Sequence, residues 1–355
     1  MNQFGISTHR IEAMRERLLS TQPTVCVQRA VLTTQAYQEY NNQPVVLKRA
    51  YCLKNVLKHM DIYIEKDTLL AGNQASANRA APIFPEYAMD WVIEELDQFE
   101  HRNGDRFTIT EENKDITSGD GHVAVNYREV LEHGLEWYKE RALKLYKALD
   151  LADFSSLKKS YFYRAVLITL DAVIDFADRY SKLAMEQAKN ECDPERKKEL
   201  FDLAKICAKV PRYPAESFHE AVQAVWFVHL VLQIESNGHS MSYGRLDQFA
   251  FPYYEKDIQN GVITKEEASE LLENLWLKTL SINKIRSWSH TRFSAGSPLY
   301  QNVTVGGQTP DGKDAVNDLS YVILQSVARL KLPQPNLTVR YHKNLSDDFM
   351  RTCIE

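Results

Sequence analysis

The amino-acid sequence predicts a helix-rich α/β fold, and three observations lead to that class. Apolar residues recur at helical spacing through most of the chain before residue 290. One stretch, 224–234, is apolar on every side, which is typical of a buried helix. Two alternating stretches, 301–307 and 336–342, flank a helical one at 318–330, and a strand, helix and strand in this order predict a parallel βαβ unit.

The N-terminal region mixes helices with irregular stretches. Helical spacing predicts one or two helices over 7–35, with a break at Pro23, and another helix over 45–60. Residues 67–73 form a short apolar piece that ends in Gly-Asn, which suits a strand or a turn. Small residues and prolines over 75–86 predict a loop.

A glycine-flanked histidine follows the next predicted helix, which covers 89–99. Gly119 and Gly121 allow a close backbone approach and positive φ, and the alternation after them suits a short extended segment over 123–125. His122 lies between these features and is a candidate site residue. A lone histidine is as often structural, so both interpretations stay open.

The middle of the chain is predicted to be one helix after another over 127–211. Asp193 before Pro194 is typical of a helix start, because the carboxylate caps the helix and proline tolerates its first position. Another helix begins near 214–216 and continues into the buried stretch. Residues 264–267, Thr-Lys-Glu-Glu, form a capping box that predicts the start of a further helix.

Polar residues appear where the buried helix is expected to stop. Asn237 and Gly238 predict a turn with a helix-ending glycine, and His239 and Ser240 follow at once. Backbone groups at such a point must be hydrogen-bonded, so these two side chains either cap the helix end or face an enclosed cavity. This stretch alone favours the cap.

Composition excludes several classes of function. A formal net charge of -5 and the absence of a Lys/Arg stripe argue against a nucleic-acid partner. The N-terminus lacks the apolar core of a signal peptide, and His229 and Gln233 interrupt the longest apolar run, so we expect a cytoplasmic protein without a membrane partner. No GxGxxG, P-loop or HExxH motif occurs.

The five cysteines are scattered without CxxC spacing, which predicts free thiols in a reducing compartment and no metal site. None of them has a recognisable catalytic setting in its own neighbourhood, and we assign none a role. They are Cys26, Cys52, Cys192, Cys207 and Cys353.

Short phrases along nearly the whole chain resemble those of the pyruvate formate-lyase-like glycyl radical enzymes, in the branch that contains glycerol and diol dehydratases. Each phrase is weak alone, and their order and spacing carry the resemblance. They are Gln28-Arg29-Ala30, Leu47-Lys48-Arg49-Ala50, Leu70-Ala71-Gly72-Asn73, Pro82-Ile83-Phe84-Pro85-Glu86, Gly121-His122-Val123, Glu235-Ser236-Asn237-Gly238-His239-Ser240, Gly244-Arg245-Leu246-Asp247-Gln248, Tyr300-Gln301-Asn302 with Gly306-Gly307-Gln308, and Leu332-Pro333-Gln334-Pro335-Asn336-Leu337.

The resemblance implies one pyruvate formate-lyase-like domain over 1–355, the N-terminal part of a ten-stranded barrel made of two antiparallel five-stranded half-barrels wrapped in helices. Residues 1–290 would be mostly helical, and 291–355 would carry strands of the first half-barrel. The implied chemistry needs no bound cofactor. It uses a glycyl radical, installed by a separate radical S-adenosylmethionine activating enzyme, and a thiyl cysteine that takes hydrogen from a small hydroxylated substrate. Family members are commonly homodimers.

The resemblance also assigns site residues. His122 matches the family histidine after the glycine-rich turn, and His239 and Ser240 match a pair that holds substrate hydroxyls. Both histidines are therefore expected to be catalytic and, with Ser240, to bind substrate, because imidazole exchanges protons near neutral pH and a hydroxyl both donates and accepts hydrogen bonds. Arg245 and Asp247 occur in a phrase shared by many branches and are expected to form a structural ion pair. Gln334 and Asn336, from the phrase that precedes the last predicted strand, are expected to order the entry to that strand, with a substrate role as the lesser possibility.

Two departures from the family pattern bear on activity. Neither the Gly-Cys-x-Glu phrase of the thiyl cysteine nor the Arg-Val-x-Gly-Tyr phrase of the radical glycine occurs in the 355 residues. A few dozen residues that the family usually has between Ile116 and Thr117 are also absent. Alone, this span is expected to be inactive. Besides radical dehydration, two functions stay open: another lyase of the family that cleaves C–N, C–S or C–C bonds, including a formate acetyltransferase-like enzyme, or a non-catalytic scaffold.

Overall fold

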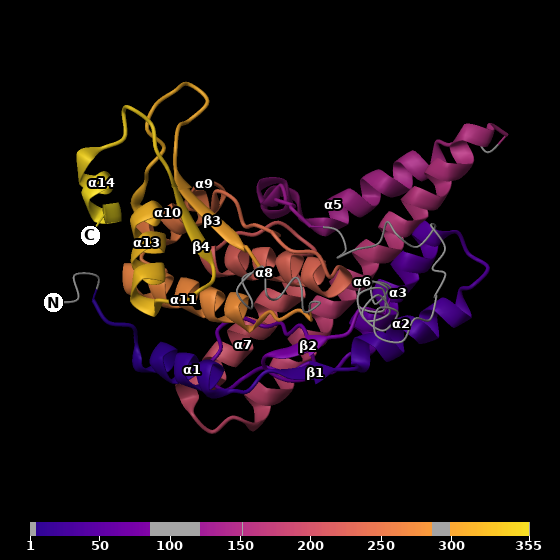
Figure 1. Ribbon diagram of the computed structural model, residues 1–355, viewed down its shortest axis with the longest axis horizontal. Coiled ribbons are helices and arrows are strands. Elements are labelled where there is room, and N and C mark those ends of the chain that lie inside the picture. Colours follow the sequence, from indigo (N-terminus) through magenta and orange to yellow (C-terminus); the bar gives the residue numbers. More distant parts are fainter. Residues whose placement is uncertain (1–4, 86–120, 151, 286–298, 355) are drawn as a thin grey trace, which may run out of the picture.

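The computed structural model describes residues 5–85, 121–150, 152–285 and 299–354, and it confirms a helix-rich α/β protein (Figure 1). The helix predicted at 89–99 and the expected boundary at residue 290 lie outside these residues. No helix in the described part is long and apolar enough to cross a membrane.

The N-terminal helices are α1 (His9–Ser20), α2 (Gln28–Glu39) and α3 (Val45–His59). The interval that holds Pro23 separates α1 from α2, as the sequence predicts. This interval contains the short strand β1 (Thr24–Cys26), which pairs in parallel with β2 (Ala80–Pro82), so the predicted loop over 75–86 is wrong at this point. Residues 67–73 form neither helix nor strand. Of the two predicted alternatives, strand or turn, the turn therefore remains.

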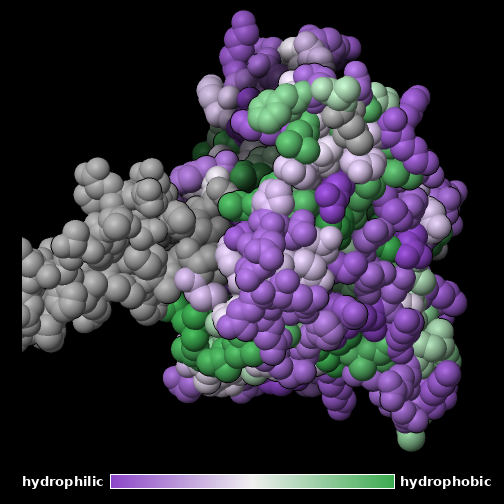
Figure 2. Space-filling view, turned by 90° about the vertical axis from the view of Figure 1, so that its right-hand side faces the viewer, coloured by the Kyte–Doolittle hydropathy of each residue, from purple (hydrophilic) through white to green (hydrophobic). Residues whose placement is uncertain are grey.

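The next helices are α5 (Tyr127–Lys147), α6 (Phe154–Asn190) and α7 (Pro194–Lys209). The Asp193 carboxylate accepts a hydrogen bond from the amide of Glu195, which confirms the predicted cap. The α5 and α6 helices form one side of the molecule, and Figure 2 shows apolar patches among hydrophilic residues on that side.

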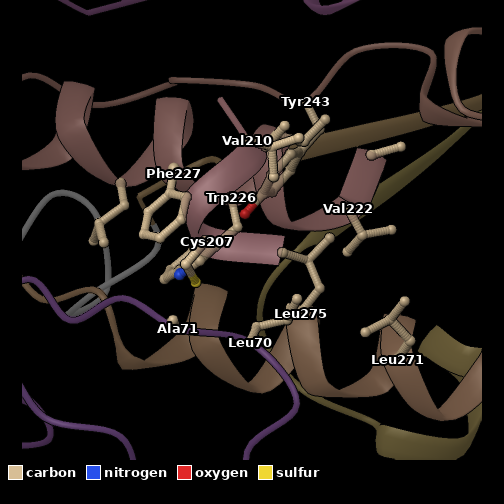
Figure 3. Packing of buried hydrophobic residues seen from close by; sticks show 14 of the residues in the cluster. Leu70, Ala71, Cys207, Val210, Val222, Trp226, Phe227, Tyr243, Leu271 and Leu275 are labelled. Atoms are coloured by element: carbon tan, nitrogen blue, oxygen red, sulfur yellow. The ribbon is translucent and has the colours of Figure 1, made fainter. Parts of the chain in front are cut away.

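At the centre lies α8 (Phe218–Glu235), which begins at the cap Ser217 and is buried on nearly all sides, as its apolar run predicts. Its neighbour α11 (Lys265–Ser281) starts at the predicted capping box of Thr264 and Glu267. In Figure 3, the central packing brings together Leu70, Ala71, Cys207, Val210, Val222, Trp226, Phe227, Tyr243, Leu271 and Leu275. Four of these come from segments before α8 and two from α11, so α8 joins distant parts of the chain into one core.

The predicted βαβ unit is confirmed by β3 (Asn302–Gly306), α13 (Asp318–Leu330) and β4 (Asn336–Arg340), because β3 and β4 pair in parallel. Two further segments extend this sheet through parallel bridges, Gly244 with Val303 and Ala124 with Ser242. Segments near residues 124, 242, 303 and 337 therefore lie side by side and run in one direction. The short helices α9 (Leu246–Phe249), α10 (Phe251–Gln259) and α14 (Asp347–Ile354) complete the described fold.

Candidate functional site

The first feature of the site is a backbone contact between two distant segments. The His122 amide donates a hydrogen bond of 2.9 Å to the His239 carbonyl oxygen, and the Ser242 amide donates one of 2.8 Å to the Val123 carbonyl. A Cβ on Gly121 would lie 2.9 Å from the His239 amide nitrogen and closer still to its carbonyl oxygen. Only glycine allows this approach, which confirms the close contact predicted from the glycine pattern.

The same contact brings two imidazole rings together. The ring centroids of His122 and His239 are 4.9 Å apart, and the rings meet edge to face at 71°. Ser240 follows His239 directly and is only partly buried. The structure therefore brings together the two histidines named by the resemblance, and Ser240 is the residue next to His239 in the chain.

His239 and Ser240 do not cap the buried helix. The residue at the C-cap of α8 is Ser236, in an extended conformation, and its Oγ accepts a hydrogen bond of 3.0 Å from the Gly238 amide. Gly238 is not among the glycines with positive φ, so the predicted helix-ending glycine is wrong. The serine hydroxyl makes the turn that sequence analysis assigned to the glycine.

Three residues of the site adopt the left-handed backbone conformation, which side chains other than glycine rarely occupy. Their φ angles are 56° at His122, 60° at Ser240 and 54° at Tyr300. The Ser240 amide donates to the Leu299 carbonyl at 2.7 Å, next to Tyr300. Backbone strain of this kind concentrates at functional sites, where surrounding contacts must hold it.

Tyr300 is the site residue that sequence analysis missed. Its ring centroid is 6.2 Å from that of His239, and 39% of its surface is exposed. The phrase Tyr300-Gln301-Asn302 served only as part of the resemblance, since no local pattern reveals a left-handed tyrosine. A phenol near the His239 imidazole adds another donor and acceptor.

Several of these polar groups are available to a ligand. Within the described residues, neither the His122 imidazole nor Ser240 Oγ has a hydrogen-bond partner, and His122 is exposed. No group of three or more His, Cys, Asp or Glu side chains in the same residues could hold a metal ion. The site as described can donate and accept protons through imidazole and hydroxyl groups.

Beneath the site lies a fully buried polar network. His229 Nε2 and Gln301 Oε1 are 2.8 Å apart, Gln301 Nε2 donates to the Thr279 carbonyl at 3.0 Å, and the Tyr127 hydroxyl lies 3.4 Å from His229 Nδ1. Burial lowers the pKa of His229 to about 4, although the hydrogen bond to Gln301 opposes the shift. His229 is therefore neutral at pH 7 and fits a structural role.

Gln334 orders the start of the last strand, as expected. Its Oε1 accepts hydrogen bonds from the Gln301 amide at 3.1 Å and from Gln301 Nε2 at 3.3 Å. Asn336 is the first residue of β4 and pairs with Asn302 of β3. The buried network thus joins α8, α11 and both strands.

The structural ion pair expected between Arg245 and Asp247 does not form. Arg245 instead donates through Nη2 to the Gly306 carbonyl at 2.7 Å, and Asp247 Oδ2 accepts from the Gly306 amide and from Ser320 Oγ, each at 2.7 Å. Burial raises the pKa of Asp247, and the hydrogen bonds from Ser320 and Gly306 oppose that rise. Both residues therefore fit a structural role. Each one binds Gly306, at the end of β3, and neither is bonded to the other.

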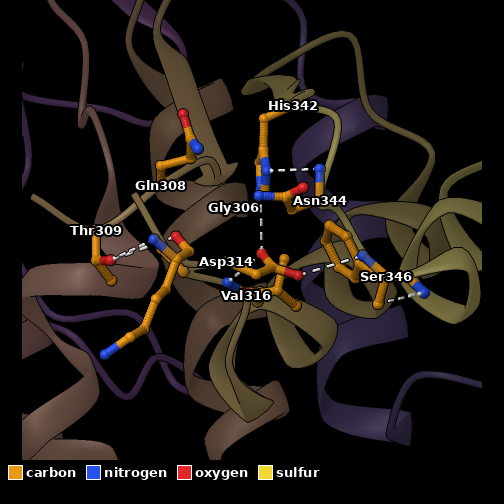
Figure 4. A network of polar contacts seen from close by, with 12 residues as sticks. Gly306, Gln308, Thr309, Asp314, Val316, His342, Asn344 and Ser346 are labelled. Atoms are coloured by element: carbon orange, nitrogen blue, oxygen red, sulfur yellow. Dashed lines mark hydrogen bonds and ion pairs between the residues drawn. The ribbon is translucent and has the colours of Figure 1, made fainter. Parts of the chain in front are cut away.

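A second polar cluster follows β3 and β4 and offers an alternative site (Figure 4). The Asp314 carboxylate lies 3.3 Å from His342 Nε2 and accepts from the amides of Val316 and Ser346. His342 Nδ1 accepts from the Asn344 amide at 3.3 Å. With both ring nitrogens of His342 engaged, Asp314 and His342 connect the loop after β3 to the start of α14, which favours a structural role.

The cysteines show no catalytic setting. Cys26, Cys52 and Cys207 are buried, Cys353 is half-buried and Cys192 is exposed, all as free thiols. Burial raises the pKa of Cys207, which disfavours its reactive thiolate.

Comparisons with known proteins place this geometry in a family. A family model for pyruvate formate lyase-like proteins matches residues 3–118 and 116–355. The chain is 40% identical to the probable dehydratase YbiW of Escherichia coli strain K12, over 391 aligned residues that cover 98% of this chain and 48% of that protein. The aligned span exceeds the chain's 355 residues, so the relative has residues inside the matched region that this chain lacks.

Two solved structures are similar in fold and sequence. The glycerol-bound form of the B12-independent glycerol dehydratase from Clostridium butyricum is 36% identical with a TM-score of 0.87, covering 98% of this chain and 49% of that one. A structure on 1,2-propanediol dehydration in Roseburia inulinivorans is 34% identical with a TM-score of 0.89, covering 99% and 47%. The chain spans about half the length of the relatives that it matches.

Proposed function

The chain belongs to the pyruvate formate lyase-like family, and we propose that it supplies the hydroxyl-binding side of a glycyl radical lyase that dehydrates a small diol or polyol. The observation that carries this proposal is the meeting of the His122 and His239 rings, 4.9 Å apart, beside Ser240. The names of the similar dehydratases, for glycerol and for 1,2-propanediol, support the substrate class.

The residues fit the demands of such a reaction. Dehydration removes one hydroxyl of a vicinal diol as water and leaves the other oxygen in a carbonyl group, without net oxidation. The departing hydroxyl needs a proton, which an imidazole supplies at neutral pH, and Ser240 Oγ can orient the hydroxyl that remains. A protein radical, when present, would take a hydrogen atom from a carbon of the substrate.

The remaining expectations belong to the same proposal. The radical glycine and the thiyl cysteine would come from sequence that these 355 residues do not contain, and a separate activating enzyme would install the radical under anaerobic conditions. We also propose a homodimer in the cytoplasm. An electron paramagnetic resonance doublet after activation of the enzyme that contains this chain would support the radical class, and its absence would argue against it.

Substrate binding by the chain itself is tested by nuclear magnetic resonance of labelled histidine side chains. Glycerol and propane-1,2-diol should shift the signals of His122 and His239 in the wild type. In His239→Ala the diol should no longer shift the His122 signal, while His59, an exposed histidine bonded to Asn55 elsewhere, serves as an internal control. Equal responses in wild type and variant, or none in either, would contradict the proposal and favour the scaffold alternative.

A further inference from the structure

The C-terminal end of α8 is held by two buried cations. The last carbonyls of a helix lack partners within the helix and carry partial negative charge. Arg29 donates from Nε to the Ile234 carbonyl at 2.7 Å and from Nη2 to the Glu235 carbonyl at 3.0 Å. Lys284 donates from Nζ to the Gln233 carbonyl at 2.7 Å. Side chains from opposite ends of the sequence thus replace the glycine cap that the sequence predicted.

The two cations share one aromatic ring. Arg29 Cζ lies 3.8 Å from the centroid of the Phe84 ring, and Lys284 Nζ lies 4.8 Å from it. All three side chains are less than a tenth exposed. We call Arg29, Phe84 and Lys284 the clamp. Cation–π contacts are strongest where water is excluded, so the ring offsets part of the cost of burying two charges.

The clamp reaches the segment that leads into the site. Lys284 also donates to the Ser236 carbonyl, and only Asn237 and Gly238 separate Ser236 from His239. Arg49 adds an ion pair of 2.6 Å to the Glu235 carboxylate. The last turn of α8 and the first residue after it are therefore bonded on several sides.

We propose that Arg29 and Lys284 are positioning residues that set the orientation of His239 and Ser240 through the end of α8. A glycine cap would satisfy the same carbonyls without buried charge. Two cations bonded to successive carbonyls hold the helix end from two directions, and the chain reaches the left-handed Ser240 four residues after Ser236. The role rests on the proposed function, since positioning matters only if His239 and Ser240 bind substrate.

The clamp also accounts for conspicuous phrases of the sequence that the site itself does not use. Arg29 lies in Gln28-Arg29-Ala30, Phe84 lies in the proline-rich phrase, and the Glu235 carbonyl that Arg29 binds belongs to the first residue of the phrase that contains His239. Gln74, just after Leu70-Ala71-Gly72-Asn73, donates to the Gln233 carbonyl at 3.1 Å. These separate phrases meet at one helix end.

The experiment compares Arg29→Met and Lys284→Met with the matched control Lys265→Met. Among the residues that the structure describes, the Lys265 ammonium makes a single ion pair, at the surface with Asp318 at 2.6 Å, so Lys265→Met removes the same charge without touching α8. We expect both clamp variants to shift the His239 imidazole signal and weaken the nuclear Overhauser contact between the rings of His122 and His239. The dissociation constant for propane-1,2-diol should rise at least about tenfold in both, and Lys284→Arg, which keeps the cation, should recover most of the loss.

The outcomes separate the two proposals. If the wild type binds diol and the clamp variants bind it equally well, with unchanged histidine signals, the positioning role is overturned while the proposed function stands. If the wild type shows no diol response, the function fails first. If a methionine variant does not fold, Phe84→Leu tests the positioning role instead, because this variant keeps both cations and their hydrogen bonds. It should still displace the His239 signal, and an unmoved signal contradicts the clamp.

Discussion

The buried histidine of α8 and the exposed histidine of the site are held in contrasting ways. Around α8, even the buried His229 is bonded through both ring nitrogens and sits between Gln301 and Tyr127. At the site, His122 is exposed and its backbone, like that of Ser240, is left-handed. The first arrangement stabilises the fold, and the second leaves donors and acceptors for a ligand at the cost of strain. We therefore expect stability to depend on the interior and diol binding to depend on the site.

Acid should destabilise the interior around His229. Because the pKa of His229 falls from 6.5 to about 4 on folding, unfolding takes up a proton between these values. The stabilisation is complete above pH 6.5 and declines as the pH falls to about 4, by about 3 kcal/mol of unfolding free energy. Urea unfolding at a series of pH values measures this loss.

His229→Gln is the control for that series. The variant can have a lower free energy of unfolding than the wild type at pH 7. As the pH falls to 4, the wild type should lose about 3 kcal/mol more of its unfolding free energy than the variant does. Burial also lowers the pKa of His219, so some acid sensitivity should remain in the variant. Parallel curves for the two proteins would show that His229 is not the acid-sensitive group.

Gly121→Ala should damage the site through its backbone. The new methyl group would press on the main chain of His239, which cannot yield as a side chain does, and overpacking of this kind costs about 2 kcal/mol. Thermal unfolding should show the loss, and the diol-dependent histidine shifts should disappear. Gly261→Ala is the contrast, because its φ of 63° is strained but no atom lies within 4 Å of the added Cβ. If Gly261→Ala impaired diol binding as much, close approach would not be the cause.

Ser240→Gly should separate strain from binding. Glycine occupies the left-handed conformation freely, so the variant should be at least as stable as the wild type, with a gain of up to about 1 kcal/mol. It should nevertheless lose the diol response, because the hydroxyl is gone. Ser240→Ala removes the hydroxyl but keeps the strain, and should show the same loss of binding without the gain. Differential scanning calorimetry of both variants measures the stability difference, and diol titration measures the loss of binding. If Ser240→Gly and Ser240→Ala were equally stable, backbone strain at Ser240 would not be the cause.

Local patterns predicted most elements near their observed bounds. Asp193 and Thr264 each cap the helix that begins at the next residue, and Pro23 lies in the short interval between two helices. A short window of sequence therefore contains the residues that set these helix ends. The failures arose where the partner was distant. The end of α8 has Arg29 and Lys284 on its carbonyls instead of a glycine cap, and Arg245 and Asp247 hydrogen-bond to Gly306 instead of to each other. None of these partners lies within a short window of the sequence.

The sequence by itself predicted the helix-rich class and the parallel strand pair, and through resemblance it named three candidate site residues. Helical spacing, alternation and capping act between neighbours along the chain, so the linear order contains them. Only the tertiary structure decided that the His122 ring meets that of His239, that Tyr300 lies near the His239 ring, and that the clamp binds the end of α8. These contacts depend on how separately folded segments pack, and packing is a property of surfaces that meet only after the chain has folded.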